Sequence, residues 1–187
     1  MNKILKLRIA ILDIMPEIWR EILIENDITF EELHKIIQIS FAWTNSHLYV
    51  FDINGTLFSV PDKEFESDDL DVKNKITEFL FSKGQKCIYT YDFGDNWEHE
   101  IEIIDILNRE KIQYPKCIAG KRNSPPEDCG GMPGYENIIE ALKSKNKSEH
   151  QYLLEWLGDY DLEKFDIDEV NEAILNPDKY LFDFRDL

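Results

Sequence analysis

The stretch YTYDFGDNWEHEIEI, residues 89–103, predicts two β-strands joined by a short turn. We expect strands over residues 86–93 and 97–107, connected by Gly94, Asp95 and Asn96, with Gly94 in the left-handed conformation that such a turn demands. Successive side chains of a strand point to opposite faces of the sheet. The second strand therefore has an apolar face, formed by Trp97, His99, Ile101 and Ile103, and an acidic face, formed by Glu98, Glu100 and Glu102.

Other strand signals surround this hairpin. Alternating apolar and polar residues predict a half-buried strand over residues 3–14, and residues 17–25 predict a second one. Residues 47–60 predict another hairpin, because Asn54-Gly55 supplies the two positive-φ residues of a tight turn. Between these strands, Thr29 and Glu32 form a capping box that starts a helix.

Helical signals follow in the last third of the chain. We expect helices over residues 135–145, 148–158 and 166–177, the second capped by Ser148 with Gln151 and the third by Asp166 with Glu169. Residues 114–136 are rich in Pro and Gly and show no periodicity, so we expect an ordered loop there.

This segregation of strands and helices predicts an α+β fold. We expect a mostly antiparallel sheet built from hairpins in the N-terminal two-thirds, packed with one early helix and a C-terminal group of about three helices. Residues 1–187 would form a single domain, with a strand-rich part over 1–107, a long ordered loop over 108–134 and a helical cap over 135–187.

Charge and cysteine content restrict the partners and the location. The chain has 38 acidic and 21 basic residues, a net charge of −17, which disfavours direct nucleic-acid binding and favours a protein partner. Three cysteines are too few for a disulfide framework. No apolar run reaches the ~18 residues of a membrane span. We expect a cytoplasmic protein, and the oligomeric state stays open.

Polar residues gather in the central hairpin and in the long loop. A binding groove is expected between residues 91–99 and 114–136, and its proposed lining is Asp92, Asp95, His99, Arg122, Glu127, Asp128 and Tyr135. The three glutamates of the hairpin are either a solvated face of the sheet or a docking site for a cation or a basic peptide.

A metal site is a second interpretation of the same segments. No cofactor is predicted, but a divalent metal, Zn or Mn, is the alternative, and its candidate ligands are Asp92, Asp95, His99, Cys117 and Cys129. Without a metal, the aspartates would organise the turn by accepting backbone amides, and His99 would be a half-buried histidine. The two cysteines would then be small buried residues that fix the loop.

Five segments carry a resemblance to a known family. In chain order they are MPEIWRE (15–21), ELHKIIQISFAWTNSHLYVF (32–51), YDFGDNWEHEI (91–101), YPKCIAGKRNSPPEDCGGMPGYE (114–136) and WLGDYDLEKFDIDEVN (156–171). With them the chain resembles the plasmid pRiA Orf-three-like family, whose members are also called insertion-element passenger (TnpR-like) proteins. The resemblance implies a single α+β domain and brings no established catalytic residues. Ala42 stands where the family usually has Gly.

Two functional hypotheses follow. The first is a non-enzymatic protein-interaction or regulatory module, linked to mobile genetic elements by the resemblance. The alternative is a metal-dependent hydrolase or nuclease-like enzyme, and the residues that it would use are Asp92, Asp95, His99, Glu127 and Asp128.

Overall fold

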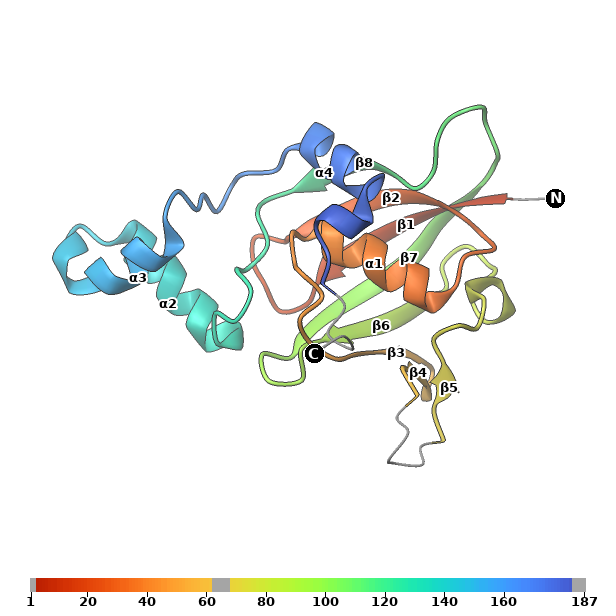
Figure 1. Cartoon of the computed structure of the whole chain (residues 1–187), viewed down its shortest axis with the longest axis horizontal. Helices are drawn as coiled ribbons and strands as arrows, with labels where there is room; N and C mark the ends of the chain where they lie inside the picture. Colours follow the sequence, from red (N-terminus) through yellow and green to blue (C-terminus); the bar gives the residue numbers. More distant parts are fainter. Residues whose placement is uncertain (1–2, 62–67, 183–187) are drawn as a thin grey trace.

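The computed structural model describes residues 3–61 and 68–182. In this part of the chain eight strands form one sheet in the order β5-β4-β3-β6-β7-β1-β2-β8 (Figure 1). The strands are β1 (Lys3–Ile11), β2 (Trp19–Glu25), β3 (Tyr49–Ile53), β4 (Thr56–Ser59), β5 (Leu70–Asp71), β6 (Lys86–Tyr91), β7 (Trp97–Asn108) and β8 (Lys116–Lys121). Only β4 and β5 pair in parallel among these strands, which confirms the mostly antiparallel α+β fold.

The central hairpin, β6 with β7, pairs Tyr91 with Trp97 and closes through a five-residue turn. Its left-handed residues are Asp92 (φ 54°) and Asn96 (φ 55°), so the expectation for Gly94 was wrong. The Asp92 side chain accepts a hydrogen bond from the Gly94 amide at 2.9 Å, and the Asn96 amide donates to the Asp92 carbonyl at 2.6 Å. Asp and Asn tolerate this conformation because their short polar side chains bond locally to the backbone.

Helix α1 (Phe30–Ser40) covers one face of the sheet (Figure 1). The predicted capping box is present, with the Thr29 side chain and the Glu32 side chain each bonded to the other's backbone amide. Phe30 stacks on Phe58 with ring centroids 4.3 Å apart and lies 5.1 Å from Phe51. Burying one such aromatic side chain stabilises the fold by about 2–3 kcal/mol.

The opposite face of the sheet is polar. Lys6 pairs with Glu21 at 2.6 Å, and Lys86 pairs with Glu100 at 2.9 Å and with Glu102 at 3.7 Å. The predicted alternation is therefore confirmed: Leu7 and Ile101, on the other face, are nearly inaccessible to solvent.

Three helices follow the sheet: α2 (Gly131–Lys143), α3 (Gln151–Leu157) and α4 (Ile167–Ile174). In Figure 1, α2 and α3 extend away from the sheet, whereas α4 lies beside β8. The Asn171 side chain of α4 accepts a hydrogen bond from the Cys117 amide at 2.8 Å and donates one to the Cys117 carbonyl at 2.9 Å. These are the bonds that a neighbouring strand would make, so Asn171 protects the edge of the sheet. The short 3₁₀ turns are η1 (Ile76–Glu78), η2 (Lys147–His150) and η3 (Pro177–Lys179).

Some sequence predictions for this region were wrong. The segment expected to be a loop contains strand β8, and α2 begins at Gly131, earlier than expected. Ser148 does not cap α3, because it lies within η2 and its hydroxyl donates to the Asn146 side chain. The Asp166 cap is confirmed, since its carboxylate accepts from the amides of Asp168 and Glu169.

Ala42, just after α1, adopts a left-handed backbone with φ 55°. A residue without a β-carbon adopts this conformation at no steric cost, which gives a physical reason for the glycine that the resembling family usually has there. Among the helices in the described residues, none combines the length and the apolar character needed to cross a bilayer.

Candidate functional site

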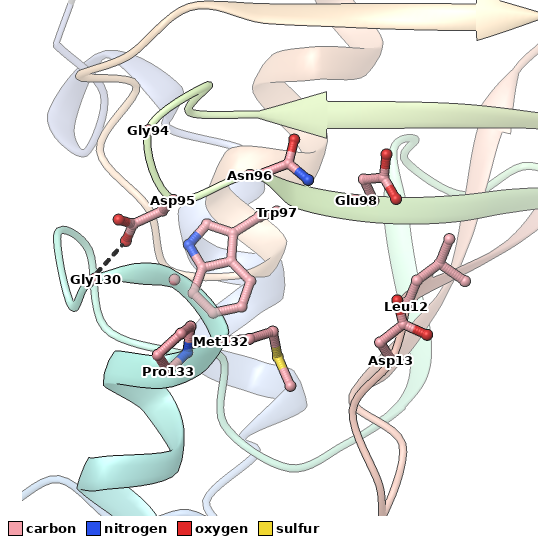
Figure 2. A pocket seen from close by; sticks show the side chains of 11 residues that line it. Leu12, Asp13, Gly94, Asp95, Asn96, Trp97, Glu98, Gly130, Met132 and Pro133 are labelled. Carbon is pink, nitrogen blue, oxygen red and sulfur yellow. Dashed lines mark hydrogen bonds between the residues drawn. The ribbon is translucent and has the colours of Figure 1, made fainter.

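A groove of about 360 Å³ lies where three distant segments meet: the turn after β1, the turn of the central hairpin and the first turn of α2 (Figure 2). The residues that line it are Leu12, Asp13, Gly94, Asp95, Asn96, Trp97, Glu98, Gly130, Gly131, Met132 and Pro133. We call this feature the turn groove. It lies between the hairpin turn and the start of α2, and residues 12–13 also contribute to it. Of the seven residues predicted to line a groove in this region, Asp95 lines it, and the other six lie elsewhere.

Backbone contacts fix the three walls of the turn groove. The Leu12 amide donates to the Glu98 carbonyl at 2.8 Å, so the pairing of β1 with β7 continues up to the groove. The Gly130 amide donates to the Asp95 carboxylate at 3.1 Å (Figure 2). Gly131 has φ 65°, and a β-carbon there would lie 2.7 Å from the Asp95 carbonyl oxygen. The first turn of α2 therefore sits directly on the turn of the hairpin.

The charged side chains that line the turn groove are all acidic: Asp13, Asp95 and Glu98. Asp95 lies against the start of α2, where the helix dipole and free amides stabilise a negative charge. Asp13 and Glu98 are exposed, and neither carboxylate forms an ion pair within the part of the chain that the structure describes. The groove thus offers a negative potential beside an apolar wall formed by Leu12, Met132 and Pro133.

Of the three glutamates on the exposed face of β7, Glu98 alone lines the turn groove. Glu100 and Glu102 are paired with Lys86 across the hairpin. The glutamates therefore divide into two that belong to a solvated face of the sheet and one that faces the groove.

The structure places Asp92 and Glu127 next to the turn groove and not in its lining. Glu127 accepts hydrogen bonds from the Thr44 amide at 2.7 Å and from the Thr44 hydroxyl at 3.0 Å, and it accepts another from the Tyr91 hydroxyl. Burial, and then the hydrogen bond to Glu127, raise the pKa of Tyr91, so its hydroxyl stays protonated and remains a donor. Asp92 is buried beneath the turn that it organises.

His99 is a core residue and does not line the groove. Its side chain is fully buried, and its Nδ1 lies 3.0 Å from the Trp97 carbonyl oxygen. The rings of Phe41 and Trp43 pack edge-on against it, with centroids 5.0 and 5.2 Å away. Burial lowers the pKa of His99 to about 4, so the ring is neutral at pH 7.

The predicted metal ligands do not come together. No three of Asp92, Asp95, His99, Cys117 and Cys129 approach within ligand distance of one another, although the structure describes all five. Burial raises the pKa of Cys117 to about 11 and that of Cys129 to about 12. Metals bind the thiolate, and these thiols keep their protons at neutral pH.

Arg122 and Tyr135 have structural roles. Arg122 is buried, and its guanidinium bonds to Glu163 at 2.9 Å and to the Pro16 carbonyl oxygen at 2.7 Å. Tyr135 is fully buried and packs edge-on against Trp97, with centroids 6.4 Å apart, which holds α2 to the hairpin.

Two residues that the structure brings to this region were not among those predicted for the groove or for a metal site. Asp13 follows the first strand, and His47 lies 2.8 Å from Asp128 and 3.7 Å from Asp92. His47 could have been noticed because it lies in TNSHLY, part of a segment that carries the family resemblance. For Asp13 the sequence offers only a single acidic residue in a turn.

Comparison with known proteins identifies the family of this chain. The model of the plasmid pRiA4b ORF-3-like protein family matches residues 3–169. The chain belongs to this family. A family relative, the uncharacterized protein y4hQ of Sinorhizobium fredii, is 31% identical over 175 residues, which cover 91% of this chain and 90% of y4hQ.

A solved structure is similar as well. The protein of unknown function MM3350 from Methanosarcina mazei Go1 is 35% identical, with a TM-score of 0.82, and the match covers 90% of this chain and 98% of that one. The similarity to MM3350 confirms the α+β fold, and the descriptions of both relatives state no enzymatic activity.

Proposed function

We propose that this protein is a non-enzymatic interaction module whose turn groove binds a lysine or arginine side chain of a protein partner. The observation that carries the proposal is the lining of the groove, where Asp13, Asp95 and Glu98 surround a cavity of about 360 Å³. Specific sites commonly combine an apolar wall with a few fixed polar groups in volumes of about 300–1,000 Å³.

Electrostatics favours a cationic protein segment over other ligands. An anion at the start of α2 would meet the carboxylates of Asp13, Asp95 and Glu98, and the net charge of −17 repels a phosphate backbone. A lysine or arginine side chain would pair with Asp13 and Glu98, while its methylene groups contact Leu12 and Met132. Because these carboxylates are exposed, the interaction would weaken as salt is added.

The binding test uses a peptide library with one fixed Arg or Lys and randomised flanking positions. We expect the protein to enrich basic peptides over the same library with norleucine at the fixed position. The double variant Asp13→Asn/Glu98→Gln should bind the best of these peptides at least about tenfold more weakly, since each lost charge-assisted contact contributes on the order of 1 kcal/mol.

The matched control is Asp159→Asn/Glu110→Gln, which makes the same change of net charge at two exposed positions away from the groove. It should leave peptide affinity within about twofold, because neither residue lines the groove and salt screens exposed charges. Equal enrichment of the norleucine library, or equal losses in both double variants, would contradict the proposal.

We propose a cytoplasmic location as well. Support comes from the three cysteines, Cys87, Cys117 and Cys129, which are all unpaired. Free thiols of this kind are typical of reducing compartments.

A further inference from the structure

A cluster of three potential metal ligands lies beside the turn groove. The Nε2 atom of His47 is 2.8 Å from Oδ1 of Asp128 and 3.7 Å from Oδ2 of Asp92, and all three atoms lie within 4.8 Å of one another. Within the described residues, no other trio of His, Cys, Asp or Glu side chains converges in this way. Four-coordinate zinc, with bonds of about 2.0–2.2 Å, places its ligand atoms about 3.4 Å apart, so small side-chain shifts would admit an ion.

Asp92 is held in place by its own backbone. Its amide donates to the Leu48 carbonyl at 3.0 Å, which ties the hairpin turn to the residue that follows His47. One carboxylate oxygen, Oδ1, accepts from the Gly94 amide at 2.9 Å. The other oxygen, Oδ2, is the one that faces His47.

The segments that carry His47 and Asp128 are joined by the hydrogen bonds of Glu127. Glu127 binds the Thr44 backbone and side chain, and it also accepts from Tyr91. Tyr91 in turn accepts from the Ser46 amide at 3.0 Å, and its ring packs edge-on against His47. Such a supporting shell orients metal ligands before an ion arrives.

The cluster is also open to solvent on one side. The side chains of Asp92, His47 and Asp128 are 12%, 31% and 68% exposed. Asp92 therefore forms the buried end of the site and Asp128 the end that is open to solvent. One imidazole nitrogen with two carboxylate oxygens suits borderline ions such as Zn²⁺, and three protein ligands leave coordination positions for water.

We propose that His47, Asp92 and Asp128 bind one divalent transition-metal ion of the Zn²⁺ class. The site goes beyond the proposed peptide binding and uses other side chains. Asp92 lies two residues before Gly94, and Asp128 lies two residues before Gly130, so the ion would join two of the three segments that form the turn groove.

The test is a calorimetric titration of the chelator-treated protein with zinc chloride. Elemental analysis after dialysis then measures how much zinc stays bound. We expect about one zinc ion per chain. His47→Gln, Asp92→Asn and Asp128→Asn should each weaken zinc binding at least about tenfold, because each removes a ligand. Asp128 is the most exposed of the three, so its variant keeps the test sound even if Asp92→Asn impairs folding.

Two variants serve as matched controls. His150→Gln removes a histidine outside the cluster, and Asp95→Asn changes the other aspartate of the hairpin turn. Both should keep wild-type zinc affinity. When loaded with Co²⁺, both control variants should show the visible absorption of the bound ion, and Asp128→Asn should not. Absence of stoichiometric zinc, or wild-type binding in both His47→Gln and Asp128→Asn, would overturn the proposal. Peptide binding measured in chelator separates this outcome from failure of the groove.

Discussion

His99 illustrates how far a single residue can be understood from its sequence neighbours. Strand alternation assigned it to the same face as Trp97, and the structure confirms that face as buried. Its closest aromatic partners, Phe41 and Trp43, come from the segment that follows α1, and no local pattern joins them to the hairpin. A histidine in a polar motif was therefore open to interpretation as a ligand until its three-dimensional surroundings were known.

The burial of His99 predicts a specific acid sensitivity. Its pKa is 6.5 in the unfolded chain and about 4 in the folded protein, so between these values the unfolded state binds a proton that the folded state does not. Stability is fully present above pH 6.5 and falls as the pH drops towards 4. Each pKa unit corresponds to 1.36 kcal/mol, so the loss is about 3 kcal/mol.

Urea unfolding of wild type and His99→Gln at a series of pH values checks this expectation. The glutamine variant should lose less stability between pH 7 and pH 4, by about 3 kcal/mol. Carboxylates also titrate in this range, but they are common to both proteins and cancel in the difference. Parallel stability curves would show that His99 does not take up the proton.

At the scale of elements, the hairpins were predictable because their signals are local. Alternation located β6 and β7, and Asn54-Gly55 supplied the turn between β3 and β4. Strand β8 was missed because it follows Pro115, contains Gly120 and lacks a clear alternation of apolar and polar residues. It is a strand because β2 and Asn171 provide hydrogen bonds along it.

The junction of α2 with the hairpin turn predicts an unusually costly glycine substitution. In Gly131→Ala the new β-carbon would lie 2.7 Å from the Asp95 carbonyl oxygen, in addition to the strain of φ 65°. We expect a loss of about 2–4 kcal/mol, combining left-handed strain with overpacking. Gly84→Ala is the matched control, because Gly84 has φ 85° and no atom within 4 Å of the added carbon.

The control should cost only about 1–2 kcal/mol, the strain alone. Thermal or urea unfolding of both variants measures the difference. If Gly131→Ala is no more harmful than Gly84→Ala, α2 does not press against the hairpin turn in the way described.

The candidate sites exist only at the scale of the whole molecule. Residues 12–13, 94–98 and 130–133 converge on the turn groove, and His47 meets Asp92 and Asp128 beside it. The sequence indicated two of the three groove segments through their glycines and acidic residues. It did not indicate the first segment, because the pairing of β1 with β7 that brings Asp13 to Glu98 is a long-range contact.

The turn groove is proposed to receive a cationic side chain. The most direct measurement is an amide NMR titration with a short Gly-Ser peptide that carries one arginine, beside the same peptide with norleucine. We predict that the arginine peptide alone shifts the amides of residues 12–13, 94–98 and 130–132, and that added salt reverses these shifts. Shifts of the same size with norleucine, or arginine-dependent shifts confined to other parts of the chain, would show that the groove does not bind a cationic side chain.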